Sequence, residues 1–273
     1  MKTSNPVLSR LGQAAERERS AGYAPAGPYG APAYGDPHQT ATGYPVAPAT
    51  TQAMTVDDVV VKTVTLLAIV GASAAAAWVL IPDSLMGAAW IGAALVGLVL
   101  GLVISFSRVA NPALVVTYAV IEGVFVGMVS KFFEVIAGYE GIVLQAVVAT
   151  FGVFFVMAML YKARVIRATP KFVRGMIAVM AGLFAVMLIN LVLSLFGVHT
   201  GLRDNGALGI GFSLICIVVA SLSFILSFAE VEEGVRLGLP QRYSWTAAFG
   251  ILVSLIWLYI EILRLLSYFQ GDD

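Results

Sequence analysis

The sequence predicts an all-α integral membrane protein, and three observations support this fold class. Hydrophobic residues make up 59% of the 273 residues and charged residues only 12%. In a soluble domain, about half of the residues are apolar and about a quarter are charged. Apolar runs of about twenty residues, the length that crosses roughly 30 Å of hydrocarbon, recur along the chain. Most charged residues lie outside these runs. Because only helices satisfy their own backbone hydrogen bonds in lipid, and the runs are too long for barrel strands, we expect helical spans.

Residues 1–54 are predicted to be a disordered cytoplasmic tail. The stretch is rich in Pro, Gly, Ala and Tyr and has almost no aliphatic periodicity, so it cannot bury enough surface to offset its ordering entropy. It lacks the basic start and apolar core of a signal peptide, and we expect it to stay on the mature protein. A solvated spacer and a docking site for a partner are both compatible with its composition.

Residues 55–270 form the predicted transmembrane domain. Prolines, glycines and polar residues separate the apolar runs, for example at Pro82, at Pro112 and at Pro170, as expected for connections between helices. We predict seven spans, near residues 59–81, 87–106, 112–133, 142–161, 173–197, 207–229 and 244–268.

The charges of the connections predict the orientation. The connection YKARVIRATPKFVR, between the fourth and fifth spans, holds five basic residues and no acid. Such a loop faces the cytoplasm. Seven spans then place the N-terminus, Arg108 and the acid-rich loop from Glu230 to Arg242 on the cytoplasmic side, and the C-terminus outside. The net charge is zero and no basic tract is present, so nucleic acid is not an expected partner.

Glu122 lies near the middle of the third span. A charged side chain there costs roughly 3 kcal/mol on insertion scales, so it needs a partner or a function. One interpretation is an ion-path carboxylate, and the other is a protonated acid that joins helices by hydrogen bonds. Gly123 and Gly127 follow at a four-residue spacing, which lets another helix approach closely.

Glu261 lies within the last apolar run, Trp245 to Leu266, and it also has two interpretations. Arg264 follows three residues later on the same helix face, so the two side chains can form a local ion pair. Alternatively, Glu261 faces the bundle interior and meets Glu230 or Glu232 from the end of the sixth helix. Two carboxylates in contact share a proton, which predicts a proton-responsive gate and an oxygen-rich site for a hard cation such as Ca²⁺.

The remaining polar residues carry less information. Arg108 is either an ordinary basic anchor at the inner end of the second span or a latch that pairs with the acids at the end of the sixth helix. Without such a contact, these acids are a solvated helix end. Gln145 and Asn190 are typical of amides that hold helices together. No other His, Cys or Asp stands at ligand spacing from His199, so we assign no metal. The lone Cys216 excludes an intrachain disulfide.

The sequence does not predict an enzyme. It contains no HExxH, GxSxG or phosphate-cradling loop. Its two histidines, His38 and His199, fall in the tail and in a loop, and no aspartate lies inside a span, so the paired groups of an intramembrane protease are missing. No cofactor is expected.

Two motifs resemble those of a known membrane-protein family. The third run, NPALVVTYAVIEGVFVGMVSKFFE, and the end, AAFGILVSLIWLYIEILRLLSYF, are similar to the third-helix and last-helix motifs of the Bax-inhibitor family. With GVRLGLPQRYSW, the end is particularly similar to a bacterial branch that bears a proline-rich N-terminal tail. The resemblance covers about residues 55–270 and leaves the tail outside.

The resemblance implies seven helices bundled around the last one, in the bacterial plasma (inner) membrane, and a pH-sensitive calcium leak. In the family, an aspartate on each of the sixth and seventh helices senses protons, and a second-helix arginine latches the closed state. The seventh-helix acid corresponds to Glu261. The sixth-helix position has no aspartate, and Glu230 and Glu232 are the nearest acids. Arg108 is nearest to the latch.

We therefore expect a calcium or proton leak controlled by Glu261, Glu230, Glu232 and Glu122, with Arg108 as the latch. The alternative is a non-conducting regulator that binds other membrane proteins, for example a membrane protease, through its basic loop or its tail.

Overall fold

The computed structural model describes residues 52–107, 109–197, 200–202 and 206–270. Within these residues, seven helices are long and apolar enough to cross a membrane, which confirms the predicted number of spans. The helices are α2 (Val56–Leu80), α3 (Met86–Phe106), α4 (Pro112–Lys131), α5 (Ile142–Lys162), α6 (Pro170–Leu195), α7 (Ala207–Arg236) and α8 (Tyr243–Gln270). A short 3₁₀ turn, η1 (Asp83–Leu85), precedes α3, and a π-helical turn, η2 (Phe132–Ile136), extends α4.

Local sequence explains where the helices begin. Thr55 and Asp58 form a reciprocal capping box at the start of α2, which satisfies two backbone N–H groups that the helix leaves open. Asn111 and Thr169 cap α4 and α6, and each is followed by a proline in the first helical position, where the absent N–H costs nothing. Pro112 and Pro170, which the sequence marks as breakers, are therefore helix starts.

The helix α7 is longer than predicted. We expected the sixth span to end near residue 229 and an acid-rich loop to follow, but α7 continues to Arg236, so this expectation is wrong. Glutamate and arginine are good helix formers, and Glu233 pairs with Arg236 three residues later (N–O 2.5 Å). Gly238 adopts a left-handed φ of +63° just beyond the helix, the usual ending of a helix. Glu230, Glu232 and Glu233 are consequently helical.

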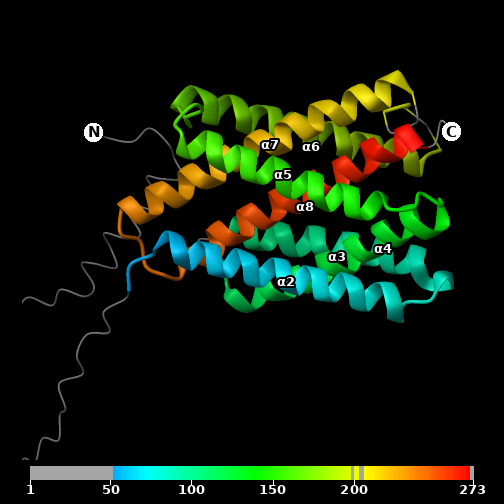
Figure 1. Ribbon diagram of the computed structural model, residues 1–273, viewed down its shortest axis with the longest axis horizontal. Helices are drawn as coiled ribbons and strands as arrows, with labels where there is room; N and C mark the ends of the chain where they lie inside the picture. The colour runs from blue at the N-terminus through cyan, green and yellow to red at the C-terminus, as the bar shows by residue number, and fades with distance from the viewer. Residues whose placement is uncertain (1–51, 108, 198–199, 203–205, 271–273) are drawn as a thin grey trace, which may run out of the picture.

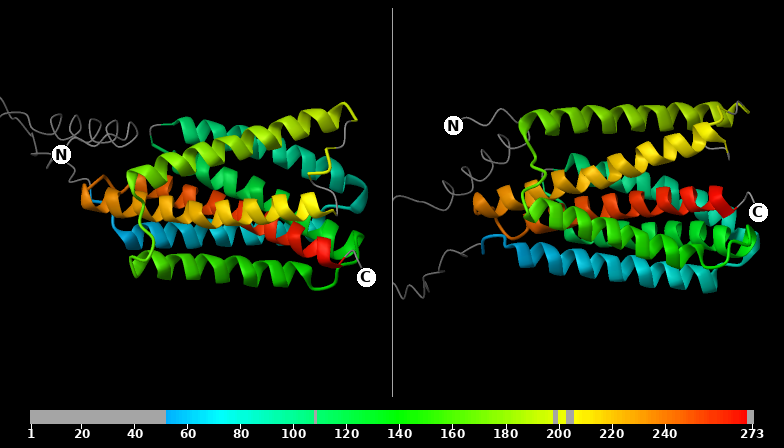
Figure 2. Two further views of the ribbon diagram at one scale, coloured as in Figure 1. Left: turned by 90° about the horizontal axis from the view of Figure 1, so that it is seen from above. Right: turned by 45° about the horizontal axis from the view of Figure 1, so that its top comes forward.

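The seven helices run along one axis with α8 at the centre (Figure 1). The span of α8 is the most buried of the seven and that of α6 the least, and Figure 2 shows α6 along the outside of the bundle. The bundling around the last helix is confirmed. The start of α2, the α5–α6 connection and the α7–α8 turn lie together at one end (Figure 1). We call this the basic end, because it carries the basic connection, and the opposite one the far end.

Two glycines set the closest helix contact. A Cβ on Gly123 would lie 2.6 Å from the Cβ of Ser73, and a Cβ on Gly127 would lie 2.6 Å from the carbonyl oxygen of Ala74. Both neighbours belong to α2. The four-residue glycine spacing therefore allows α2 and α4 to pack with their backbones in contact, as expected for small residues in membrane helices.

Candidate functional site

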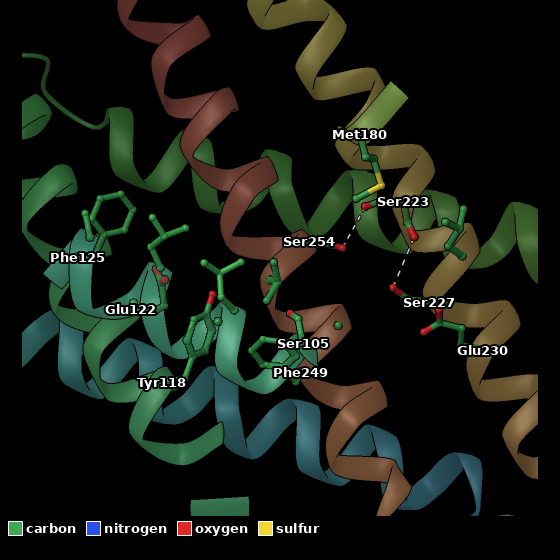
Figure 3. Close-up of a pocket in the computed structure, with 18 residues that line it drawn as sticks. Ser105, Tyr118, Glu122, Phe125, Met180, Ser223, Ser227, Glu230, Phe249 and Ser254 are labelled. Carbon is green, nitrogen blue, oxygen red and sulfur yellow. Dashed lines mark hydrogen bonds between the residues drawn. The ribbon is translucent and has the colours of Figure 1, made fainter. Parts of the chain in front are cut away.

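A cavity of about 530 Å³ is lined by α3 and α4 on one side and by α7 on the other (Figure 3). The helix α8 lies between these two sides and also contributes residues to the lining. This volume is within the range of small-molecule and ion sites. Each helix contributes residues from one face, at spacings of three or four positions. The polar lining consists of two carboxyl groups, four serine hydroxyls and one phenol, which belong to Glu122, Glu230, Ser105, Ser223, Ser227, Ser254 and Tyr118.

The cavity extends from the basic end to about the middle of the bundle. On α4, ten residues separate Pro112 from Glu122, which is about 15 Å at the helical rise and half of the roughly 30 Å of hydrocarbon. On α7, Glu230 lies six residues before the helix end, or about 9 Å. The two carboxyl groups thus occupy different depths on opposite walls (Figure 3).

Glu122 is accommodated by a glycine on the neighbouring helix. A Cβ on Gly97 of α3 would lie 2.6 Å from a carboxyl oxygen of Glu122, so no larger residue fits there without moving the acid. Tyr118, one turn earlier on α4, lines the same cavity as this carboxyl group. Glu122 therefore faces α3 and the cavity, whereas the next residue, Gly123, faces α2.

Glu230 lines the other wall and continues a row of hydroxyl groups. On α7, Ser223 lies seven residues before Glu230 and Ser227 lies three residues before it. All three residues therefore share one helix face. The Ser223 hydroxyl donates to the Ser254 hydroxyl of α8 at 3.0 Å. This row supplies oxygen atoms from the basic end to the middle of the bundle.

Glu261 lies elsewhere, at the far-end half of α8. Its side chain is buried, and both carboxyl oxygens accept from Nη1 of Arg264 at 2.9 Å. The Ser213 hydroxyl of α7 donates to the Glu261 backbone carbonyl at 3.2 Å. Of the two interpretations that the sequence left open, the local ion pair is the one that the structure contains.

The expected contact of Glu261 with Glu230 or Glu232 is therefore wrong. Because α7 and α8 are antiparallel, the residue opposite Glu261 is Ser213, and seventeen residues separate Ser213 from Glu230 along α7. This corresponds to about 25 Å. The structure instead places Glu230 in one cavity with Glu122.

The other sequence candidates are placed as follows. Glu232 is the hydrogen-bond acceptor of the Tyr161 hydroxyl of α5, at the basic end. Asn190 donates to the Thr200 hydroxyl, and Gln145 is exposed. The proposed latch Arg108 and His199 lie outside the described residues.

Sequence reasoning missed the serines and Gly97. The signal for the serines is the spacing Ser223, Ser227, Glu230, which puts three polar groups on one face of an otherwise apolar helix. No comparable signal exists for Gly97, because its role depends on a carboxyl group that another helix supplies.

The arrangement suits a hydrated cation better than a chelated one. Among the described residues, no group of three or more His, Cys, Asp or Glu side chains is arranged to hold a metal ion. Calcium takes six to eight oxygen ligands, and the two carboxyl groups are on opposite walls (Figure 3). Water would therefore have to complete the shell of any cation that Glu122 or Glu230 attracts.

Comparison with known proteins agrees with the motifs. A search of curated proteins found no match. The family described as Bax inhibitor 1 like matches residues 5–271, which includes most of the predicted tail, so our expectation that the resemblance stops near residue 55 is wrong. Nearly the whole chain is matched, and the described residues contain seven helices long and apolar enough to cross a membrane, so this protein belongs to the Bax inhibitor 1 like family.

Proposed function

We propose that this protein conducts cations, calcium or protons, across the bacterial plasma membrane, and that protonation of intramembrane carboxyl groups controls the conduction. The observation that carries the proposal is the cavity that joins Glu230 near the basic end to Glu122 near mid-membrane. A carboxylate within a membrane bundle is a candidate functional group, because its insertion costs free energy. In low-dielectric surroundings they attract cations more strongly than they do in water.

In this proposal, the described arrangement is the closed state. Beyond Ser223 and Ser254, the seam between α7 and α8 is filled by Cys216, by Leu258 and by the Glu261–Arg264 pair, all of them buried or nearly so. A cation that enters from the basic end therefore reaches the middle of the bundle, and its further passage requires α7 and α8 to separate.

The sign of the pH effect follows from the charges. Ionised Glu122 and Glu230 attract a divalent cation, whereas the protonated acids do not. Calcium flux should consequently be greater at about pH 8 than at about pH 6. Replacement by glutamine imitates the protonated acid and should give a low flux at both values.

The test is calcium flux into liposomes that contain the purified protein, measured at about pH 6 and pH 8. Glu122→Gln and Glu230→Gln should each flatten the pH dependence. Glu140→Gln, at an exposed acid in the far-end connection, is the matched control and should behave as wild type. Glu261→Gln leaves the buried Arg264 charge in the α7–α8 seam without its partner, so it should raise the flux while retaining its pH dependence.

The alternative function, a non-conducting regulator of other membrane proteins, makes a different prediction. No flux above that of empty liposomes at either pH would refute the conduction proposal. A pH-dependent flux that neither Glu122→Gln nor Glu230→Gln changes would refute the assignment of the cavity acids.

A further inference from the structure

The segment just before α2 is fastened to the turn between α7 and α8. The Met54 amide donates to the Leu239 carbonyl at 2.7 Å, and the Gln241 amide donates to the Gln52 carbonyl at 2.8 Å. Ala53 and Pro240 face each other as an antiparallel bridge. We call this pairing, residues 52–54 with residues 239–241, the clasp.

Met54 places the clasp one helical turn beyond the cavity, on the side of α7 that carries Glu230. Met54 is only 3% exposed. Its Sδ and Cε atoms lie 3.4 Å from the position that a Cβ of Gly234 would occupy. Gly234 is one helical turn after Glu230, so both residues lie on the same side of α7. The thioether therefore fills the space that the glycine leaves at the last turns of this helix.

Two charged residues of α2 connect the clasp to the start of α8. Asp58 accepts a hydrogen bond from the Gln241 side-chain amide at 2.6 Å. Lys62 donates to the Gln241 carbonyl at 3.3 Å and to the Ser244 hydroxyl, and its ammonium group lies 5.4 Å from the centre of the Trp245 ring. The beginnings of α2 and α8 and the end of α7 are thus joined at one point.

We propose that Met54 is a positioning residue for Glu230 and that opening of the clasp accompanies the movement of α7 that conduction requires. The α7–α8 turn is the hinge of the two helices that have to separate. The backbone hydrogen bonds of the clasp resist displacement of this turn. The contact of Met54 with Gly234 resists displacement of the last turns of α7. On the side of α5, the last turns of α7 are held by the hydrogen bond from Tyr161 to Glu232.

The effect of the clasp on flux rests on the proposed function, but its coupling to Glu230 does not. Coupling between two sites is reciprocal, so a change at Glu230 must alter how often the clasp opens. Hydrogen exchange of the Met54 and Gln241 amides reports this opening directly.

The first experiment measures hydrogen exchange in the full-length protein in lipid nanodiscs. Glu230→Gln should change the exchange rate of peptides that contain Met54 and Gln241 by at least about threefold, and Glu140→Gln should leave it unchanged. Unchanged exchange in Glu230→Gln would overturn the proposal, whether or not the protein conducts.

The second experiment locks the clasp with a disulfide. Ala53 and Pro240 lie opposite each other in the clasp. The two backbone hydrogen bonds of the clasp lie on either side of this pair and do not join its two residues. The Cα atoms of such a pair are about 4.5 Å apart, a separation that a disulfide spans. The buried Cys216 is the only native cysteine. Oxidised Ala53→Cys/Pro240→Cys should show about tenfold lower calcium flux, which a reductant should restore.

Each single-cysteine variant, with and without reductant, is the control for the lock, and its flux should not respond to the reductant. Equal flux in the oxidised and reduced double variant, with both singles conducting, would refute the role of the clasp. Absence of flux in wild type would refute the proposed function instead, and the hydrogen-exchange result would still decide the coupling.

Two further variants separate positioning from general stability. Met54→Gly should raise the flux, and Met54→Leu, which fills the same space, should restore the wild-type value. Likewise, removal of residues 1–54 should raise the flux whereas removal of residues 1–51 should not. Equal flux in the two truncated proteins would contradict the assignment.

Discussion

The buried pair of Glu261 and Arg264 permits a quantitative prediction. The side chain of Glu261 is 2% exposed and that of Arg264 is 16% exposed, and one guanidinium nitrogen donates to both carboxyl oxygens at 2.9 Å. The variants are Glu261→Gln, Arg264→Met and the double substitution. Each single substitution leaves one buried charge without its partner, while the double substitution leaves none.

The expected magnitude follows from this geometry. At 2.9 Å and an effective dielectric constant of about 20, two unit charges attract by about 6 kcal/mol, and the cost of burying both charges offsets part of this attraction. Breaking a buried pair by removing one partner costs about 3 to 5 kcal/mol. We expect each single substitution to lower the free energy of unfolding by about 3 kcal/mol. The double substitution should lower it by less than the sum of the two single effects, with a coupling free energy of about 3 kcal/mol.

The measurement is reversible unfolding in mixed detergent micelles, followed by circular dichroism for all four proteins. The exposed pair of Glu233 and Arg236 is a suitable internal control, because it has the same three-residue spacing and comparable distances, 2.5 and 2.7 Å. Its guanidinium side chain is 68% exposed, so water screens the attraction and the corresponding cycle should be nearly additive.

Additive effects at the Glu261–Arg264 pair, within about 0.5 kcal/mol, would refute this reasoning. They would mean that the two side chains are not coupled in the folded protein, as when Arg264 reaches water once its partner is removed. The interpretation of the α7–α8 seam as filled by a buried ion pair of α8 would then fail as well.

Two further predictions concern stability. Gly127→Leu should destabilise the protein by about 2 kcal/mol or more, because a Cβ at this position would lie 2.6 Å from the backbone of α2. Gly92→Leu is the control and should have little effect in the same unfolding assay, because a Cβ there would meet nothing within 4 Å. Glu134→Gln should cost about 1 kcal/mol, because Glu134 accepts from the Gly141 and Val143 amides at the start of α5 at 2.7 and 3.0 Å. For Glu134→Gln, wild-type stability in chemical denaturation, with Glu140→Gln as the control, would contradict the capping role.

The acids illustrate how far residue patterns can predict a site. Glu122 was recognisable because a single carboxylate in an apolar span is conspicuous and costly. Glu230 was recognised as a candidate, but for contact with Glu261, since spacing along each helix contains no information about the register between helices. The antiparallel register of α7 and α8 is set by many packed side chains, among them Ser223 against Ser254, and it separates the two acids.

The ends of the helices show a second limit. Hydropathy marks the part of a helix that lies in hydrocarbon, whereas the helix itself continues as long as its residues favour it. The polar last turns of α7, from Glu230 to Arg236, were therefore taken for a loop. The clasp was missed for a different reason, because residues 52–54, which form one side of it, were assigned to the disordered tail.

By itself, the sequence determined the fold class, the seven spans, the common location of the basic connection and the α2 start, and the resemblance to the family that matches the chain. These properties follow from local composition, because lipid requires every spanning segment to be apolar and to satisfy its own backbone hydrogen bonds. Only the tertiary structure decided the partners: Arg264 for Glu261, Gly97 beside Glu122, α2 against Gly127, and the clasp. Such partners depend on the rotation and register of each helix against its neighbours, which arise from packing over the whole bundle.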